Sequence, residues 1–231
     1  MIKLMKLELK RMSLRPYIIC VIAFSMGLLA FIYFVAYVAQ VEQELQFQEY
    51  KNIFRITMAV SIILFSILSA VMYSHLIIDE YTGNRPTLLF SYSVSRKSIL
   101  IAKILVVFLF VLLSMLFCTM VPLTIFSITE SISPIVGGDL KEELFASCQL
   151  IVTSIISVAS IGVVSMRNGF IKKSISMTLI CAFALSGLFG NIAVGSADNS
   201  SIALLIMGFY FIIAMIAVFE LSNKIENMEV E

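Results

Sequence analysis

Residues 17–39 read YIICVIAFSMGLLAFIYFVAYVA, a run of 23 residues without a charged side chain. About 20 apolar residues are enough to cross the hydrocarbon core of a bilayer as a helix. Twelve of the 23 are Leu, Ile, Val or Phe, and each favours insertion by about 0.3–0.6 kcal/mol. A cleaved signal peptide fits less well, because its apolar region has only about 7–15 residues and cleavage after Ala39 would put bulky Tyr37 where a small residue is needed. The run therefore predicts a retained transmembrane helix.

Five more apolar stretches of this kind follow along the chain. The sequence is 60% hydrophobic and 13% charged, whereas soluble domains have about 45–50% apolar and about 25% charged residues. The predicted fold class is therefore an all-α integral membrane protein, with residues 1–231 forming a single transmembrane domain. The six transmembrane helices are expected at about 17–39, 53–78, 101–129, 144–166, 174–194 and 201–221. Pro122 is expected to kink the third of them.

The placement of Lys and Arg predicts the orientation of these spans, because cytoplasmic segments are enriched in both. With the N-terminus inside, 13 of the 16 basic residues lie on the cytoplasmic side, and Lys51, Arg55 and Lys141 are left outside. The external segments instead collect acidic residues: Glu42, Glu44, Glu49, Glu130, Asp139, Glu142, Glu143 and Asp198. We therefore expect a multi-pass protein of the cell (plasma) membrane with both termini in the cytoplasm.

Residues 1–15 precede the first span and have the pattern of an amphipathic helix. At 100° per residue, Lys3, Lys6, Lys10 and Ser13 form one stripe beside an apolar one. Such a helix can lie in the headgroup layer with its lysines on anionic lipid. The alternative is that these residues only anchor the first span by the positive-inside rule.

The sequence lacks several kinds of catalytic chemistry. No Gly-x-x-x-x-Gly-Lys-Ser/Thr phosphate loop occurs, and the one histidine, His75, excludes a His-x-x-x-His zinc site and is expected at headgroup level. The four cysteines lie in apolar stretches and are interpreted as buried small hydrophobic residues. The spans hold almost no ionisable side chains, which argues against a self-powered transporter. Energy for any uphill transport would then come from a partner.

The second and third spans are joined by the longest cytoplasmic connection, and residues 79–103 read DEYTGNRPTLLFSYSVSRKSILIAK. Gly83 and Pro86 indicate turns, and the apolar cluster Leu88–Phe90 follows them. An apolar cluster exposed to the cytoplasm usually belongs to an interface. The pattern favours a short helix across the inner membrane face that docks into another protein. The alternative is that Leu88–Phe90 dips into lipid.

This segment resembles the permease subunits of type-2 ATP-binding-cassette exporters, the small six-span kind found with peptide antibiotics. That family has an acidic residue, a Gly-containing turn, a Leu-Leu pair, Ser-Arg and a later Lys between spans two and three. The matching residues here are Glu80, Gly83, Leu88, Leu89, Ser95, Arg96 and Lys103. The sequence departs from the pattern where Ser93 replaces a proline and Gly-Asn replaces Gly-Thr.

The resemblance implies a cytoplasmic coupling helix that docks on an ATPase subunit. The docking contact would be made by Arg85, Pro86, Leu88, Leu89 and Phe90. It also implies that Glu80 ends the second span near the N-terminal helix, where Lys6 or Lys10 would pair with it.

The expected function is that of a permease subunit without an ATPase site, in an exporter of an amphipathic or hydrophobic cargo such as an antimicrobial peptide, toxin or drug. ATP and Mg would be bound by the partner ATPase, and no catalytic, cofactor or metal residue is assigned to this chain. The expected partners are a cytoplasmic ATP-binding-cassette ATPase, a second permease in a homodimer or heterodimer, and membrane lipid, but no nucleic acid. The alternative function is a non-transporting immunity or sensor protein that binds a toxin or peptide through its outer loops.

Overall fold

The computed structural model describes residues 2–42, 49–82, 96–132, 140–196 and 199–226. Over these ranges the chain is built of helices, and six of them are long and apolar enough to span a membrane. This confirms the predicted fold class. In chain order, the elements are α1 Ile2–Arg11, α2 Arg15–Glu42, α3 Tyr50–Tyr73, the π-helix η1 Ser74–Ile78, α4 Asp79–Thr82, α6 Arg96–Ile132, α7 Leu140–Lys172, α8 Ile175–Gly195 and α9 Ser200–Glu226.

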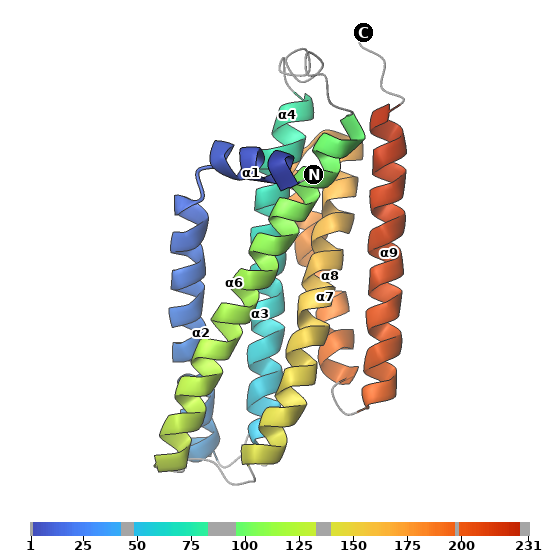
Figure 1. The fold of residues 1–231 in the computed structure, drawn as a ribbon. Coiled ribbons are helices and arrows are strands. Elements are labelled where there is room, and N and C mark those ends of the chain that lie inside the picture. Colours follow the sequence, from blue (N-terminus) through green and yellow to red (C-terminus); the bar gives the residue numbers. More distant parts are fainter. Residues whose placement is uncertain (1, 43–48, 83–95, 133–139, 197–198, 227–231) are drawn as a thin grey trace.

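The six long helices lie side by side, and α1 lies across one end of them (Figure 1). This end, at the top of Figure 1, also carries α4, the start of α6 and the end of α9, and we call it the α1 end. The 37 residues of α6 extend about 55 Å at 1.5 Å per residue. That length exceeds the roughly 30 Å of a hydrocarbon core, so α6 reaches beyond the apolar layer or tilts within it. It continues through Pro122 without a break.

The core of the bundle lies around α3, α6 and α7, whose apolar side chains are mostly buried. In contrast, α2, α8 and α9 expose most of theirs, including Phe34, Phe183 and Leu205. An exposed apolar surface of this extent suits lipid, which is as apolar as the side chains themselves. The same reason explains an error in the sequence interpretation of the cysteines. Cys118 is buried, but Cys20 and Cys148 are exposed on the outside of the bundle.

Two glycines of α7 let it approach its neighbours closely. A Cβ atom at Gly162 would lie 2.6 Å from the Ser69 Oγ of α3, and one at Gly169 would lie 2.7 Å from the Ile78 Cδ1 of η1. Real Cβ atoms do not come this near to other atoms, so side chains at these positions would push the helices apart. Small residues at such crossings are a common way for membrane helices to pack.

The hydroxyl groups of α7 take part in this packing. Thr153, Ser154 and Ser157 are buried and donate to carbonyls four residues earlier in their own helix. Ser160 Oγ also lies 2.9 Å from the Tyr210 carbonyl of α9. These contacts stay within and between helices, which favours a packing role for these hydroxyls over contact with cargo.

Candidate functional site at the α1 end

The second membrane helix changes its winding at the α1 end, where α3 passes into η1 and α4. The Asp79 N–H donates to the Ser74 carbonyl, five residues earlier, instead of the four that an α-helix uses. Such a π-turn leaves carbonyls of the helix in need of other donors, and π-turns are frequent at functional sites. Within this turn, the Leu76 carbonyl accepts a hydrogen bond from Lys103 Nζ at 3.0 Å.

Lys103 comes from the second turn of α6 and is fully buried. A buried ammonium is costly unless it is both paired and hydrogen-bonded. Both conditions are met here, because Nζ donates to the Glu80 carboxylate as well as to the Leu76 carbonyl. Lys103 thus joins the start of α6 to the end of the second span.

Glu80 is the centre of this junction. Its Oε2 accepts from Lys103, and its Oε1 lies 3.1 Å from the Arg11 Nη1 of α1. The Glu80 side chain is 12% exposed, so water screens the pair with Lys103 only weakly. One carboxylate therefore connects α1, α4 and α6, and we call Arg11, Glu80 and Lys103 the charged junction.

A polar cleft of about 470 Å³ lies beside the charged junction. It is enclosed by the last turn of α1, the first residues of α2 and the π-turn with α4. On its wall, His75 Nδ1 and Asp79 Oδ2 lie 3.0 Å apart. The His75 side chain is exposed.

The charged junction differs in one respect from the contact that the sequence predicted. Glu80 does lie against the N-terminal helix, but its partner there is Arg11. Lys6 and Lys10 are exposed on α1 and form no ion pair among the described residues. The reason is that Glu80 meets the final residue of α1, whereas Lys6 and Lys10 lie on exposed parts of that helix. The predicted docking residues Arg85, Pro86, Leu88, Leu89 and Phe90 lie outside the described residues.

Sequence reasoning also missed two further contacts in which a charged residue joins two helices. Arg167 of α7 makes a two-pronged ion pair with Glu220 of α9, with Nε–Oε2 and Nη2–Oε1 distances of 2.8 and 2.6 Å. Glu130 was expected in an outer loop, but α6 continues to Ile132, and the Glu130 side chain is buried. There Glu130 Oε1 accepts a 2.7 Å hydrogen bond from Tyr50. An acidic residue in the last turn of an apolar span is the signal that could have indicated both contacts.

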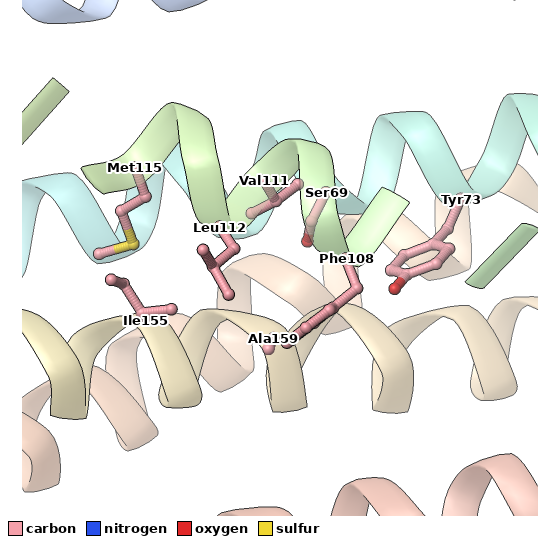
Figure 2. Close-up of a pocket in the computed structure, with 8 residues that line it drawn as sticks. All are labelled: Ser69, Tyr73, Phe108, Val111, Leu112, Met115, Ile155 and Ala159. Carbon is pink, nitrogen blue, oxygen red and sulfur yellow. The ribbon is translucent and has the colours of Figure 1, made fainter. Parts of the chain in front are cut away.

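A small apolar crevice lies deeper in the bundle, between α3, α6 and α7. Figure 2 shows Phe108, Leu112 and Met115 of α6 facing Ile155 and Ala159 of α7. The hydroxyl of Ser69, which also lines the crevice, donates to the Ser66 carbonyl of its own helix. The crevice measures about 10 Å³, roughly the space of one water molecule, so this conformation leaves no room for cargo there.

The fold and this junction define an integral membrane protein with six membrane-length helices and a charged contact at the base of one inter-helix link. Residues 4–186 match the family described as "ABC-2 family transporter protein". The chain belongs to this family and is a membrane component of an ATP-binding-cassette transporter, of the permease type. Such components carry no ATPase site and work with an ATP-binding-cassette partner.

One curated relative is the uncharacterized protein YcbO of Bacillus subtilis strain 168. It is 22% identical over 199 residues, which cover 85% of this chain and 87% of YcbO. No solved structure shows a significant match to the chain.

Proposed function

We propose that the chain is the membrane subunit of an ATP-driven exporter, in which a cytoplasmic ATPase docks on residues 83–95 and moves α3 and α6 together. The observation that carries this proposal is the charged junction. Glu80 and Lys103 border the link on its two sides, and their contact ties the end of the second span to the start of the third. A displacement of the link would therefore act on both helices at once, and on α1 through Arg11.

The π-turn supplies the place where the second span can bend. It lies directly before α4, and Lys103 satisfies the Leu76 carbonyl within it. Because the donor of that hydrogen bond belongs to α6, a shift of α6 would lengthen or break the bond that stabilises the turn. We infer that ATP-driven movement of the link alters η1 first and then the packing of α3 against α7 at Gly162.

The proposed complex contains two permease subunits, identical or different, and two ATPase subunits that bind ATP and Mg. Both termini lie in the cytoplasm and the chain resides in the cell membrane. The cargo is an amphipathic or hydrophobic molecule of the class of antimicrobial peptides, toxins and drugs. The apolar lining of the crevice between α3, α6 and α7 supports this class, because widening it would expose an apolar path.

Docking is tested by isolating the tagged chain in mild detergent together with the ATPase encoded beside it. Leu88→Asp with Phe90→Asp should abolish ATPase capture while membrane insertion persists. The matched control, Ser91→Asp with Ser93→Asp, adds the same charges to the same segment but keeps the apolar side chains, so it should retain the ATPase. Equal capture by both variants would show that the docking residues are assigned incorrectly. Failure of the unaltered chain to bring down any ATPase would instead favour a membrane immunity or sensor protein.

Coupling is tested separately with Glu80→Gln, which removes the charge that joins α4 to α6 and α1. ATPase capture should persist, whereas stimulation of ATP hydrolysis by cargo should be lost. Glu49→Gln, at the other end of the bundle, is the control and should couple normally. If Glu80→Gln couples as well as the unaltered chain, the charged junction does not transmit movement.

A further inference from the structure

The cleft beside the charged junction has the size and chemistry of a ligand site. Its volume of about 470 Å³ falls within the roughly 300–1,000 Å³ of small-molecule sites. Its walls hold both signs of charge, with Glu8 and Arg11 from α1 facing His75 and Asp79 from η1 and α4. Met12, Tyr17 and Leu76 add an apolar part.

Some charged groups of the cleft are fully paired with other residues of the protein, and others are not. Glu80 is already engaged by Lys103 and Arg11. Asp79 uses only Oδ2 for His75, and Glu8 forms no ion pair among the described residues. Arg11 gives Nη1 to Glu80 but is 61% exposed, so other donors of its five N–H groups face solvent. The cleft thus offers two carboxylates for a cation and one guanidinium for an anion.

The cleft also lies beside the ends of two membrane-length helices, where phospholipid headgroups are expected. The first membrane-length segment begins at Arg15, and the second ends at Ile78. The lining residues Pro16, Tyr17, Leu76 and Asp79 lie within two residues of these limits. Tyrosine is enriched at this level because its ring is apolar and its hydroxyl polar. A ligand in the cleft can therefore keep acyl chains in the membrane.

We propose that the cleft binds the headgroup of an aminophospholipid of the phosphatidylethanolamine type. Its primary ammonium donates hydrogen bonds to Glu8 and Asp79, and its phosphate accepts from Arg11. Charge-assisted bonds of this kind are about twice as strong as neutral ones. A choline headgroup has no N–H to donate, and a glycerol headgroup has no cation, so both bind less well. The proposal depends neither on the ATPase nor on the direction of transport.

The experiment is native mass spectrometry of the purified full-length chain, titrated with phosphatidylethanolamine, phosphatidylcholine and phosphatidylglycerol of identical acyl chains. The unaltered chain should bind the ethanolamine lipid about tenfold more tightly than the choline lipid, as expected for loss of a charge-assisted hydrogen bond. Glu8→Gln with Asp79→Asn should remove this preference. Arg11→Gln should weaken binding of all three lipids. Glu49→Gln, which removes a carboxylate at the other end of the bundle, should change nothing.

Three results would overturn the proposal. The first is equal affinity of the unaltered chain for ethanolamine and choline lipids. The second is an ethanolamine preference that survives in Glu8→Gln with Asp79→Asn, and the single variants provide the same comparison if the double variant does not fold. The third is competition by soluble glycerophosphoethanolamine at the concentration at which the lipid binds, which would assign the cleft to a soluble ligand.

Discussion

At the scale of single residues, Lys103 is a buried charge that joins two elements at the α1 end. It is fully buried and bonds two elements, with the Leu76 carbonyl on one side and Glu80 on the other. Removing one partner of a buried ion pair typically costs about 3–5 kcal/mol, because the other charge is left without compensation. We therefore expect Lys103→Met to lower the free energy of unfolding by about this amount, measured by denaturant titration in detergent micelles.

Two further variants show whether the loss of stability comes from breaking the Glu80–Lys103 ion pair or from replacing any lysine. Lys10→Met alters an exposed lysine of α1 and should change stability by no more than about 0.5 kcal/mol. Lys103→Met combined with Glu80→Gln removes both charges and should recover part of the loss. If the double variant loses as much stability as the two single variants together, or more, the Glu80–Lys103 pair does not stabilise the fold.

A second residue-scale prediction concerns Glu130 at the other end of the bundle. Its carboxylate is buried and accepts a 2.7 Å hydrogen bond from the Tyr50 hydroxyl. A hydrogen bond to a charged group contributes about 1.5–3 kcal/mol. Tyr50→Phe should therefore destabilise the protein by about this amount in the same titration. Tyr37→Phe removes a hydroxyl from an exposed tyrosine of α2. An equal loss of stability in that variant would show that the Tyr50–Glu130 hydrogen bond is not the cause.

At the scale of elements, the end of α7 shows how one residue sets a short connection. The Lys173 N–H donates to the Phe170 carbonyl and the Ser174 N–H to the Gly169 carbonyl, the two bonds of a Schellman motif. Lys173 has a φ of 50°, a left-handed conformation that costs a residue with a Cβ about 1–2 kcal/mol. Lys173→Gly should therefore raise stability by up to about 1 kcal/mol. Lys172→Gly alters the last residue of α7, which lacks the left-handed conformation, so it should bring no gain, and a gain there would rule out this explanation.

The sequence allowed the elements to be predicted well, because each span is a long run of apolar residues with polar residues at its ends. The expected spans coincide with helices, although α6 and α7 extend further than the apolar runs. Glu130 and Arg167 therefore lie just outside the expected spans 101–129 and 144–166, although both are helical. Polar residues can remain helical when a partner on another helix satisfies them, as Tyr50 does for Glu130 and Glu220 does for Arg167. Such partners depend on packing and are invisible in a hydropathy pattern.

The candidate site was predictable only in part. Glu80 and Lys103 both belong to the motif that carries the family resemblance, but nothing in the sequence indicates that they contact each other. The π-turn changes the winding of the second span just before Glu80, and the hydropathy pattern gives no sign of it. The choice of Arg11 over Lys6 and Lys10 depends on where α1 crosses the bundle. These are consequences of tertiary packing.

At the scale of the whole molecule, the distribution of basic residues predicts which way the bundle faces. The ends of α1 and α7, with their basic residues, lie at the α1 end, and Lys103 contacts Glu80 of α4 there. Of the 16 Lys and Arg residues, 13 belong to segments expected at this end. The positive-inside rule places this end in the cytoplasm. A green fluorescent protein fused after Glu231 should therefore fluoresce, and alkaline phosphatase inserted within residues 133–139 should be active.

The orientation should also resist loss of the basic stripe on the N-terminal helix. Replacing Lys3, Lys6 and Lys10 by Gln leaves ten of the thirteen basic residues on the predicted inner side. Since orientation follows the summed Lys and Arg bias of the loops, both reporters should keep their activities in the triple variant. The matched variant replaces Lys51, Arg55 and Lys141, the three basic residues on the predicted outer side. Both reporters should keep their activities in this variant as well. Inversion of the reporters by the first variant alone would show that the N-terminal helix, and not the whole set of charges, determines how the protein enters the membrane.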